Sequence, residues 1–217
     1  MQPYLYPYAG YFRLMALADT FVILDDVQFA RRGRMHRCEI PDPRNGTAWL
    51  TLPIARQCRD ISIGDVAFAE NARAELDARL RRLRWLAGDG PLAGRVRAHL
   101  YGPLTTPCQF VAHGLALVAE ALELPARHLR SSSLDIDRAL RGEARILAVA
   151  QALGARTYIN SPGGRHLYDP VSFAEAGVEL RFLAPYDGRF PFLLPALMTD
   201  HPEALREDIV ERCTLLP

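Results

Sequence analysis

Hydrophobic positions along this chain follow two periodicities that alternate. Three times, a short stretch with helical spacing is followed by a compact apolar run of the kind that forms a strand. The three pairs are Leu14 to Asp19 with Phe21 to Leu24, Ala144 to Leu153 with Thr157 to Ile159, and Ser172 to Ala176 with Val178 to Leu183. Gly154 and Gly177 separate the last two pairs, and glycine closes a helix there at little cost. This order is typical of units that feed a parallel or mixed sheet.

The pattern changes between the first and second units. Trp49 to Ile54 and Ile61 to Val66 resemble strands, and we expect them to extend the sheet as an antiparallel, hairpin-like insertion. Helices then predominate from about residue 69 to 124, in Ala69 to Leu86 and Gln109 to Leu122. The arginine-rich side of the first helix is either a solvated face or an anion-binding patch. Glu203 to Cys213 is predicted to close the chain as a helix.

We therefore predict an α/β fold for residues 1–217. The expected architecture is a single domain with a mixed, mostly parallel sheet flanked by helices, an antiparallel strand insertion and a helical middle segment. A chain of 217 residues with 49% hydrophobic and 24% charged residues suits one substantial core.

Charge and composition exclude several classes of function. The formal charge is +1, from 26 basic and 25 acidic residues, which disfavours a nucleic-acid or anionic-membrane partner. All the basic residues are arginine. Without lysine the protein cannot form a Schiff base, and it has neither a P-loop lysine nor a kinase lysine. No apolar run has the length of a membrane span or the pattern of a secretory signal.

Four cysteines are scattered along the chain without framework spacing, at positions 38, 58, 108 and 213. This usage is typical of reduced thiols, so we expect a cytoplasmic protein without disulfides.

Candidate chemistry gathers where predicted strands end. Asp25 and Asp26 directly follow Phe21 to Leu24, and Gln28 lies just beyond. Ligands of α/β sheets bind at such carboxyl ends, although a capped strand end is the simpler interpretation. Two adjacent carboxylates supply too few ligands for magnesium, so we expect no metal and no cofactor.

The second predicted strand ends in a glycine-containing turn, Asn160 to Arg165. Asn160, Ser161, Gly163 and Gly164 offer polar atoms and backbone amides to a ligand. A plain Ser-Pro-Gly-Gly turn explains the same residues.

Two further segments carry candidate side chains. The N-terminal segment holds Gln2, Tyr4, Tyr8 and Tyr11 among prolines, and it forms either the wall of a polar pocket or an aromatic lid over the core. His36, Arg37 and Cys38 lie together downstream. An imidazole and a guanidinium would lower the pKa of a nearby thiol, whereas a buried, inert cysteine is the other interpretation.

The motifs QPYLYPYAGYF after Met1 and FVILDDVQF from Phe21 to Phe29 resemble those of the WbqC-like protein family. Further similarity lies in WLTLP from Trp49 and in YINSPGG from Tyr158. The resemblance implies a role in O-antigen or other specialised biosynthetic clusters, with glycine or aminoacyl transfer as the suggested activity. It also implies a few strand residues before Gln2. The segment His36 to Cys38 departs from an Asn-Arg-Asn element usual in that family.

The resulting hypothesis is a cofactor-independent biosynthetic transferase that moves an acyl or aminoacyl group from a thioester or ester to an amine or hydroxyl. In this scheme Cys38 is the nucleophile, His36 the base and Asp26 the residue that orients it. Gln28 and Arg37 hold a small-molecule or carrier-protein-bound donor, and Asn160 to Gly164 stabilise the oxyanion. A noncovalent variant uses Asp26 or His36 as general base. The alternative is a binding protein for a sugar, a nucleotide or a carrier-bound intermediate, without catalysis.

Overall fold

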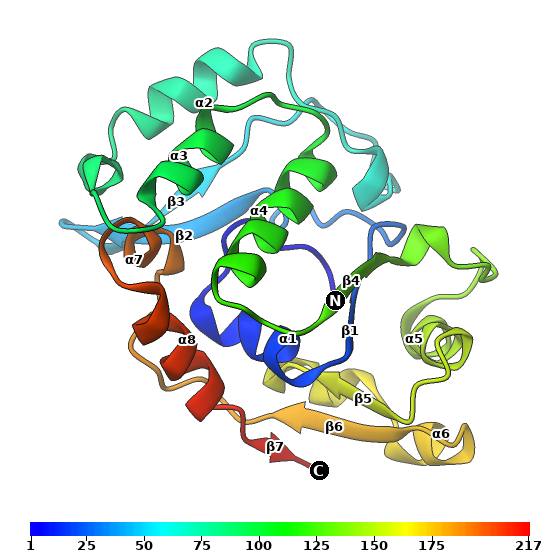
Figure 1. Cartoon of the computed structure of the whole chain (residues 1–217). Coiled ribbons are helices and arrows are strands. Elements are labelled where there is room, and N and C mark those ends of the chain that lie inside the picture. Colours follow the sequence, from blue (N-terminus) through cyan, green and yellow to red (C-terminus); the bar gives the residue numbers. More distant parts are fainter.

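The computed structural model describes residues 1–217 as a mixed α/β fold, which confirms the predicted class (Figure 1). The helices are α1 Arg13–Leu17, α2 Ala72–Leu80, α3 Ala93–Tyr101, α4 Pro107–Ala121, α5 Gly142–Ala152, α6 Pro170–Glu175, α7 Leu193–Thr199 and α8 Pro202–Glu211. The strands are β1 Thr20–Ile23, β2 Arg37–Asp42, β3 Gly46–Thr51, β4 Arg127–Arg130, β5 Thr157–Asn160, β6 Glu179–Leu183 and β7 Leu215–Leu216.

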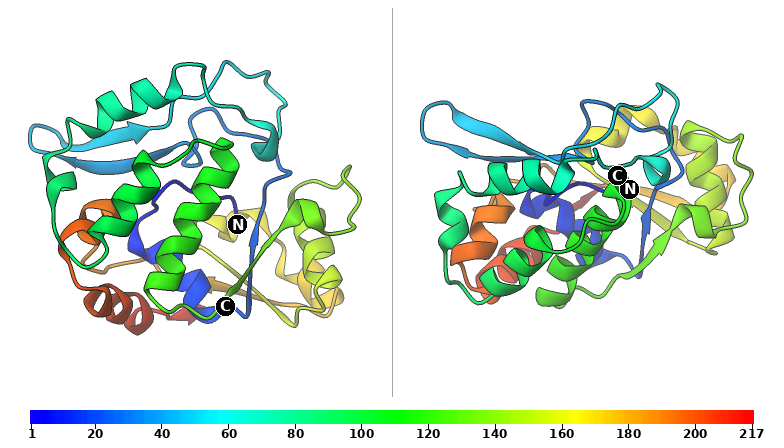
Figure 2. Two further views of the ribbon diagram at one scale, coloured as in Figure 1. Left: turned by 45° about the horizontal axis from the view of Figure 1, so that its top comes forward. Right: turned by 90° about the horizontal axis from the view of Figure 1, so that it is seen from above.

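The strands form three small sheets. β1 pairs with β4 in parallel, with Phe21 opposite His128. β2 and β3 form an antiparallel hairpin, which projects from the body of the molecule (Figure 2). β5 and β6 are parallel, and the short β7 adds antiparallel to β6. Mixed pairing was expected, but the predicted sheet is divided into separate pieces.

The three predicted helix and strand pairs are present as α1 with β1, α5 with β5, and α6 with β6. Gly154 and Gly177 close the last two helices in the left-handed conformation, with φ of 62° and 72°. Two helices, α4 and α6, each begin with a proline in the first turn and a side-chain cap. The Thr106 side chain accepts a hydrogen bond from the amide of Gln109 at the start of α4. The Asp169 side chain accepts one from the amide of Val171 at the start of α6.

Three local predictions were wrong. Ile61 to Val66, predicted as a strand, contains instead the 3₁₀ turn Ile63–Asp65. The hairpin partner of β3 is therefore not this segment but β2, which precedes β3 in the chain. Ala69 to Leu86 is interrupted after Leu80, so α2 is followed by a separate 3₁₀ turn, Arg84–Ala87. The sequence analysis also missed α3, α7, β2, β4 and β7. No helix is both long enough and apolar enough to cross a bilayer.

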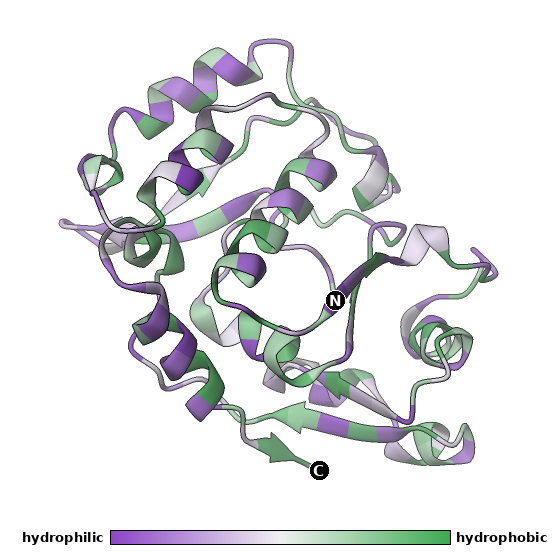
Figure 3. Ribbon diagram, viewed as in Figure 1, coloured by the Kyte–Doolittle hydropathy of each residue, from purple (hydrophilic) through white to green (hydrophobic).

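One large core joins the N-terminal segment, α1 and β1 to the β2–β3 hairpin and the helices α2, α3, α4, α7 and α8. A smaller cluster lies under α5 and α6, around Leu24, Ile146 and Phe173. The helices place apolar residues toward these cores, and α8 shows hydrophilic and hydrophobic residues on different sides (Figure 3).

Arg13 is the largest side chain among those that are fully buried. Its guanidinium donates to the carbonyl oxygens of Gly10 at 3.2 Å, Arg212 at 2.8 Å and Ala184 at 2.9 Å. The Tyr186 ring lies 5.3 Å from its Cζ. A buried cation is tolerated here because three carbonyl dipoles, two of them from segments distant in sequence, replace its hydration.

We predict that Arg13→Met lowers the free energy of unfolding by about 3 kcal/mol, because three carbonyls lose their donor. Urea denaturation measures this change. The matched control is Arg181→Met, which removes an arginine whose ion pair with Glu179 is exposed, and we expect a change below about 0.5 kcal/mol. Equal losses in the two variants would contradict the proposed role of Arg13.

Candidate site at the carboxyl ends of β1 and β4

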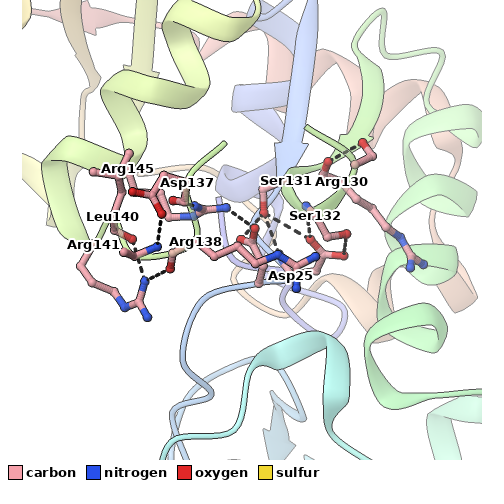
Figure 4. Close-up of polar contacts among 12 residues, drawn as sticks. Asp25, Arg130, Ser131, Ser132, Asp137, Arg138, Leu140, Arg141 and Arg145 are labelled. Atoms are coloured by element: carbon pink, nitrogen blue, oxygen red, sulfur yellow. Dashed lines mark hydrogen bonds and ion pairs between the residues drawn. The ribbon is translucent and has the colours of Figure 1, made fainter. Parts of the chain in front are cut away.

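The parallel strands β1 and β4 end side by side, and polar residues follow both. Asp25 and Asp26 come shortly after β1, and the 3₁₀ turn Ser131–Ser133 follows β4 directly. Figure 4 shows the side chains of Asp25, Ser131 and Ser132 pointing toward one another across this gap. Carboxylates and hydroxyls separated by more than 100 residues in sequence therefore share one site.

Asp25 is buried, and both of its carboxylate oxygens are occupied. Oδ1 accepts from the amide of Ser132 at 2.9 Å, and Oδ2 accepts from the hydroxyl of Ser132 at 2.7 Å. The backbone of Asp25 is held as well: its amide donates to Ser131 Oγ at 3.2 Å, and its carbonyl accepts from the amide of Gly64 at 2.6 Å. Asp25 therefore serves as a clamp between β1 and the turn after β4.

Asp26 differs because its side chain keeps 14% exposure. Its Oδ1 accepts from the hydroxyl of Ser131 at 2.6 Å, and its Oδ2 forms an ion pair with Arg145 of α5. Arg145 is only 4% exposed and also donates from Nη1 to the carbonyl of Asp137 at 3.1 Å, while its Nε has no partner. A carboxylate fixed on two sides and open on a third can bind an incoming amine or hydroxyl.

The serines and Arg145 were missed by the sequence analysis. β4 reads Arg-His-Leu-Arg and lacks an apolar run, so the pattern gave no reason to place a strand before Ser131. The triple serine was the available signal, since hydroxyls directly after a strand often lie at a site. Arg145 lies on a helix with many apolar neighbours and carries no motif of its own.

Cys38 lies in the main core, on β2 opposite Leu50, and is 3% exposed. Burial, with a smaller contribution from Glu39, raises the pKa of its thiol to about 12. A nucleophilic cysteine needs the thiolate, so this environment opposes the hypothesis of covalent catalysis at Cys38. The alternative interpretation in the sequence, a buried and inert cysteine, agrees with these contacts.

His36 and Arg37 contact aromatic rings and form no bond to the aspartates. Burial, and then the charge of Arg37, lowers the pKa of His36, whose ring packs edge-on against Phe29 at 5.2 Å. The Arg37 guanidinium stacks over the ring of Trp49 at 4.1 Å. No hydrogen bond or ion pair joins these residues to Asp26, so the three predicted catalytic side chains do not form a triad.

The tyrosine-rich N-terminus packs against the core. Tyr11 is buried, lies 5.3 Å from the Tyr4 ring and donates its hydroxyl to the carbonyl of Gln2 at 2.8 Å. Tyr8 contacts Tyr186 at 5.6 Å between ring centroids. Gln2, Tyr4 and Tyr8 remain partly exposed. These three side chains can therefore contact a substrate, whereas the buried Tyr11 cannot.

The turn after β5 is organised by its own asparagine. Asn160 is buried and accepts from the amide of Ser161 at 2.7 Å through Oδ1. Gly164 lies so close that a Cβ there would be 2.5 Å from Asn160 Nδ2, whereas Gly163 is exposed with free space around its Cα. Gly163 therefore leaves room for a ligand close to its backbone.

Gln28 extends the candidate surface beyond Asp26. Its Nε2 donates to the carbonyl of Arg59 at 3.0 Å and to Asp60 Oδ1 at 3.3 Å. The neighbouring Cys58 is exposed. No three His, Cys, Asp or Glu side chains come together as the ligands of a metal ion would.

Comparison with known proteins gives two matches. The model of the WbqC-like protein family matches residues 2–192. The uncharacterised protein Rv1507c of Mycobacterium tuberculosis is 40% identical over 48 residues, which cover 22% of this chain and 20% of that protein. The chain thus aligns with about a fifth of the length of this relative. No solved structure shows significant similarity to the chain.

We predict that one of the four thiols reacts quickly with Ellman's reagent in the folded protein at pH 8. Cys58 is exposed, whereas burial raises the pKa of Cys38 to about 12 and that of Cys108 to about 11. Cys213 is partly buried, and burial raises the pKa of its thiol as well. Roughly one Cys38 in ten thousand is then a thiolate. The variant Cys58→Ser should lose the fast phase. Rapid alkylation located on Cys38 by peptide mass would overturn this view of the thiol.

Proposed function

This chain belongs to the WbqC-like protein family, and we propose that it is a biosynthetic transferase acting in the formation of a polysaccharide or specialised metabolite. The transferred group is an acyl or aminoacyl group of the glycyl type. The donor is an activated thioester or ester, small or bound to a carrier protein, and the acceptor is an amine or hydroxyl.

The observation that carries the proposal is the partly exposed carboxylate of Asp26 at the joined ends of β1 and β4. Ser131 and Arg145 fix its orientation, and the residue follows β1 at the strand end where ligands of parallel sheets bind. A carboxylate in such a position orients an amine or hydroxyl and removes its proton as it attacks the donor carbonyl. Asp26 thus takes the role of general base on the acceptor.

Direct transfer to the acceptor fits the site better than a covalent intermediate. The acceptor nitrogen or oxygen bonds to the donor carbonyl carbon, and the thiol or alcohol of the donor leaves. No side chain has to carry the acyl group, which agrees with the burial and the high pKa of Cys38. Gly163, exposed in the turn after β5, offers its backbone amide to the carbonyl oxygen of the donor.

A noncatalytic binding protein is the second candidate, and one observation favours it. Both oxygens of Asp25 and both oxygens of Asp26 are already engaged within the protein. Such a network can form a rigid rim around a bound sugar, nucleotide or carrier-bound intermediate. This role suits the network as well as proton transfer does. Thermal stabilisation by a ligand, without turnover of any donor, would support this candidate.

We predict opposite results for two variants in a transfer assay. The assay presents a panel of acyl and aminoacyl thioesters with amino-sugar acceptors and detects products by mass spectrometry. Asp26→Asn should lower kcat by about a hundredfold or more, because the base is lost. Cys38→Ala should stay within about threefold of the wild type.

Asp26→Asn also leaves Arg145 without its carboxylate, so stability needs a matched control. Asp208→Asn removes a buried aspartate of α8 whose Oδ1 lies 3.1 Å from Arg212 Nη1, away from the ends of β1 and β4 (Figure 1). We expect this variant to lose stability and to keep its kcat below its melting temperature. Loss of activity in Cys38→Ala, together with an acyl adduct on Cys38 in the wild type, would contradict direct transfer.

A further inference from the structure

A shallow cleft lies where the tyrosine-rich N-terminal segment passes beside the start of β2. Its polar lining comes from these two segments: Tyr4 and Tyr8 from the first, and Arg34, Arg37 and Glu39 from the second. The closed part of the cleft holds about 10 Å³, which is the room that one water-sized group needs. The cleft can therefore enclose one end of a ligand, and the rest of the ligand would lie on the surface outside.

The backbone of the N-terminal segment is fixed on both sides of this cleft. The amide of Leu5 donates to the carbonyl of Arg34 at 3.0 Å, just before β2. The amide of Ala9 donates to the carbonyl of Phe190 at 3.2 Å, next to Pro191, which also lines the cleft. The walls are thus joined by backbone hydrogen bonds and do not depend on a ligand for their position.

Tyr6, between the two exposed tyrosines, holds the segment in an unusual conformation. Its φ of 34° is rare for a residue other than glycine. His99 Nε2 donates to the carbonyl of Phe110 at 3.0 Å, and burial lowers the pKa of His99 to about 4, so the ring is neutral and Nδ1 accepts from the Tyr6 hydroxyl at 2.6 Å. This buried bond keeps Tyr6 in place, and with it the arrangement of Tyr4 and Tyr8.

The free polar groups of the lining side chains are all able to donate a hydrogen bond. Both oxygens of Glu39 are already occupied by Arg34, at 3.0 and 3.1 Å, so the one carboxylate of the cleft has no free charge to offer. Within the N-terminal segment, the hydroxyls of Tyr4 and Tyr8 have no partner in the chain. A ligand that accepts hydrogen bonds therefore suits the cleft.

Arg37 adds a positive charge that no acidic residue balances. It makes one hydrogen bond, from Nη2 to the carbonyl of Arg32, and its buried Nε has no partner. The charge of Arg34 is balanced by Glu39 in an ion pair, whereas Arg37 stacks over the ring of Trp49 at 4.1 Å. The three charged side chains of the cleft thus carry a net charge of about +1 at neutral pH.

We propose that this cleft binds the carboxylate of a small organic molecule. One carboxylate oxygen matches the water-sized space, accepts from the hydroxyls of Tyr4 and Tyr8, and balances the charge of Arg37. A phosphate would bring a second negative charge close to Glu39, so a singly charged anion is the better match. Trp49 is 41% exposed beside Arg37 and offers an apolar surface to the body of the ligand.

This inference goes beyond the transfer reaction proposed for Asp26 and does not depend on it. The test measures binding alone, so a failure of the transfer assay leaves it intact, and the reverse also holds.

The test uses the full chain with Trp85→Phe, in which Trp49 is the remaining tryptophan and reports on the cleft by its fluorescence. The probes are glucuronate and benzoate, with glucose and benzamide as their neutral counterparts and glucose 6-phosphate as the phosphate. We expect at least one carboxylate to change the fluorescence of Trp49, and its neutral counterpart to bind at least about tenfold more weakly. Glucose 6-phosphate should bind more weakly than glucuronate.

Two variants and two matched controls locate the binding. Arg37→Gln should weaken binding of the carboxylate by at least about tenfold, and Tyr8→Phe, which keeps the ring and removes only the hydroxyl, by about threefold. The controls are Arg81→Gln and Tyr101→Phe, which change an exposed arginine and an exposed tyrosine of other segments and should bind like the parent chain.

The proposal fails if neither carboxylate binds, or if each carboxylate binds no better than its neutral counterpart. Unchanged binding in Tyr8→Phe together with unchanged binding in a folded Arg37→Gln protein would place the carboxylate elsewhere and overturn it. Tighter binding of glucose 6-phosphate than of glucuronate would overturn the assignment to a carboxylate.

Discussion

The carboxylate of Asp25 holds the two ends of the β1–β4 pair in register, and the candidate site depends on it. β1 and β4 are four residues each and form a two-stranded sheet, which alone has little stability in water. Asp25 joins them through the amide and hydroxyl of Ser132 while Gly64 fixes its own carbonyl. A buried carboxylate with two donors from one turn gives the strand ends a single geometry.

Asp26 builds on that geometry and links it to the other half of the molecule. Its ion pair with Arg145 connects the end of β1 to α5, which covers β5 and the smaller core. Such a buried pair adds little net stability relative to apolar packing, but removal of one partner leaves an uncompensated charge. The residue proposed for chemistry is therefore also part of the frame, and the stability and activity of its variants have to be measured separately.

The strongly apolar parts of this fold could be predicted from the sequence. β1, β5 and β6 have compact hydrophobic runs, and left-handed glycines close the helices before β5 and β6. β4 could not be predicted, because Arg127 to Arg130 is polar and becomes a strand only through its pairing with β1. Ile61 to Val66 was mistaken for a strand because alternation alone does not distinguish a strand from a buried turn.

Only the part of the candidate site that follows a strongly apolar strand could be predicted from the sequence. Asp25 and Asp26 follow an obvious strand, so their position could be inferred from local pattern. Ser131 and Arg145 reach them only through the tertiary fold. The neighbours of Cys38 in the sequence suggest a reactive thiol, but which face of β2 points into the core is decided by the packing of the hairpin, and Cys38 lies on that face.

The exposed thiol of Cys58 makes the candidate site observable by spectroscopy. Cys58 precedes Arg59 and Asp60, which both bind the side chain of Gln28, two residues beyond Asp26. A fluorescent or paramagnetic label can be attached there in one step, because Cys38 and Cys108 are buried and burial raises the pKa of the partly buried Cys213. The native cysteine thus supplies a ready reporter at the rim of the site, with no engineered residue in the protein.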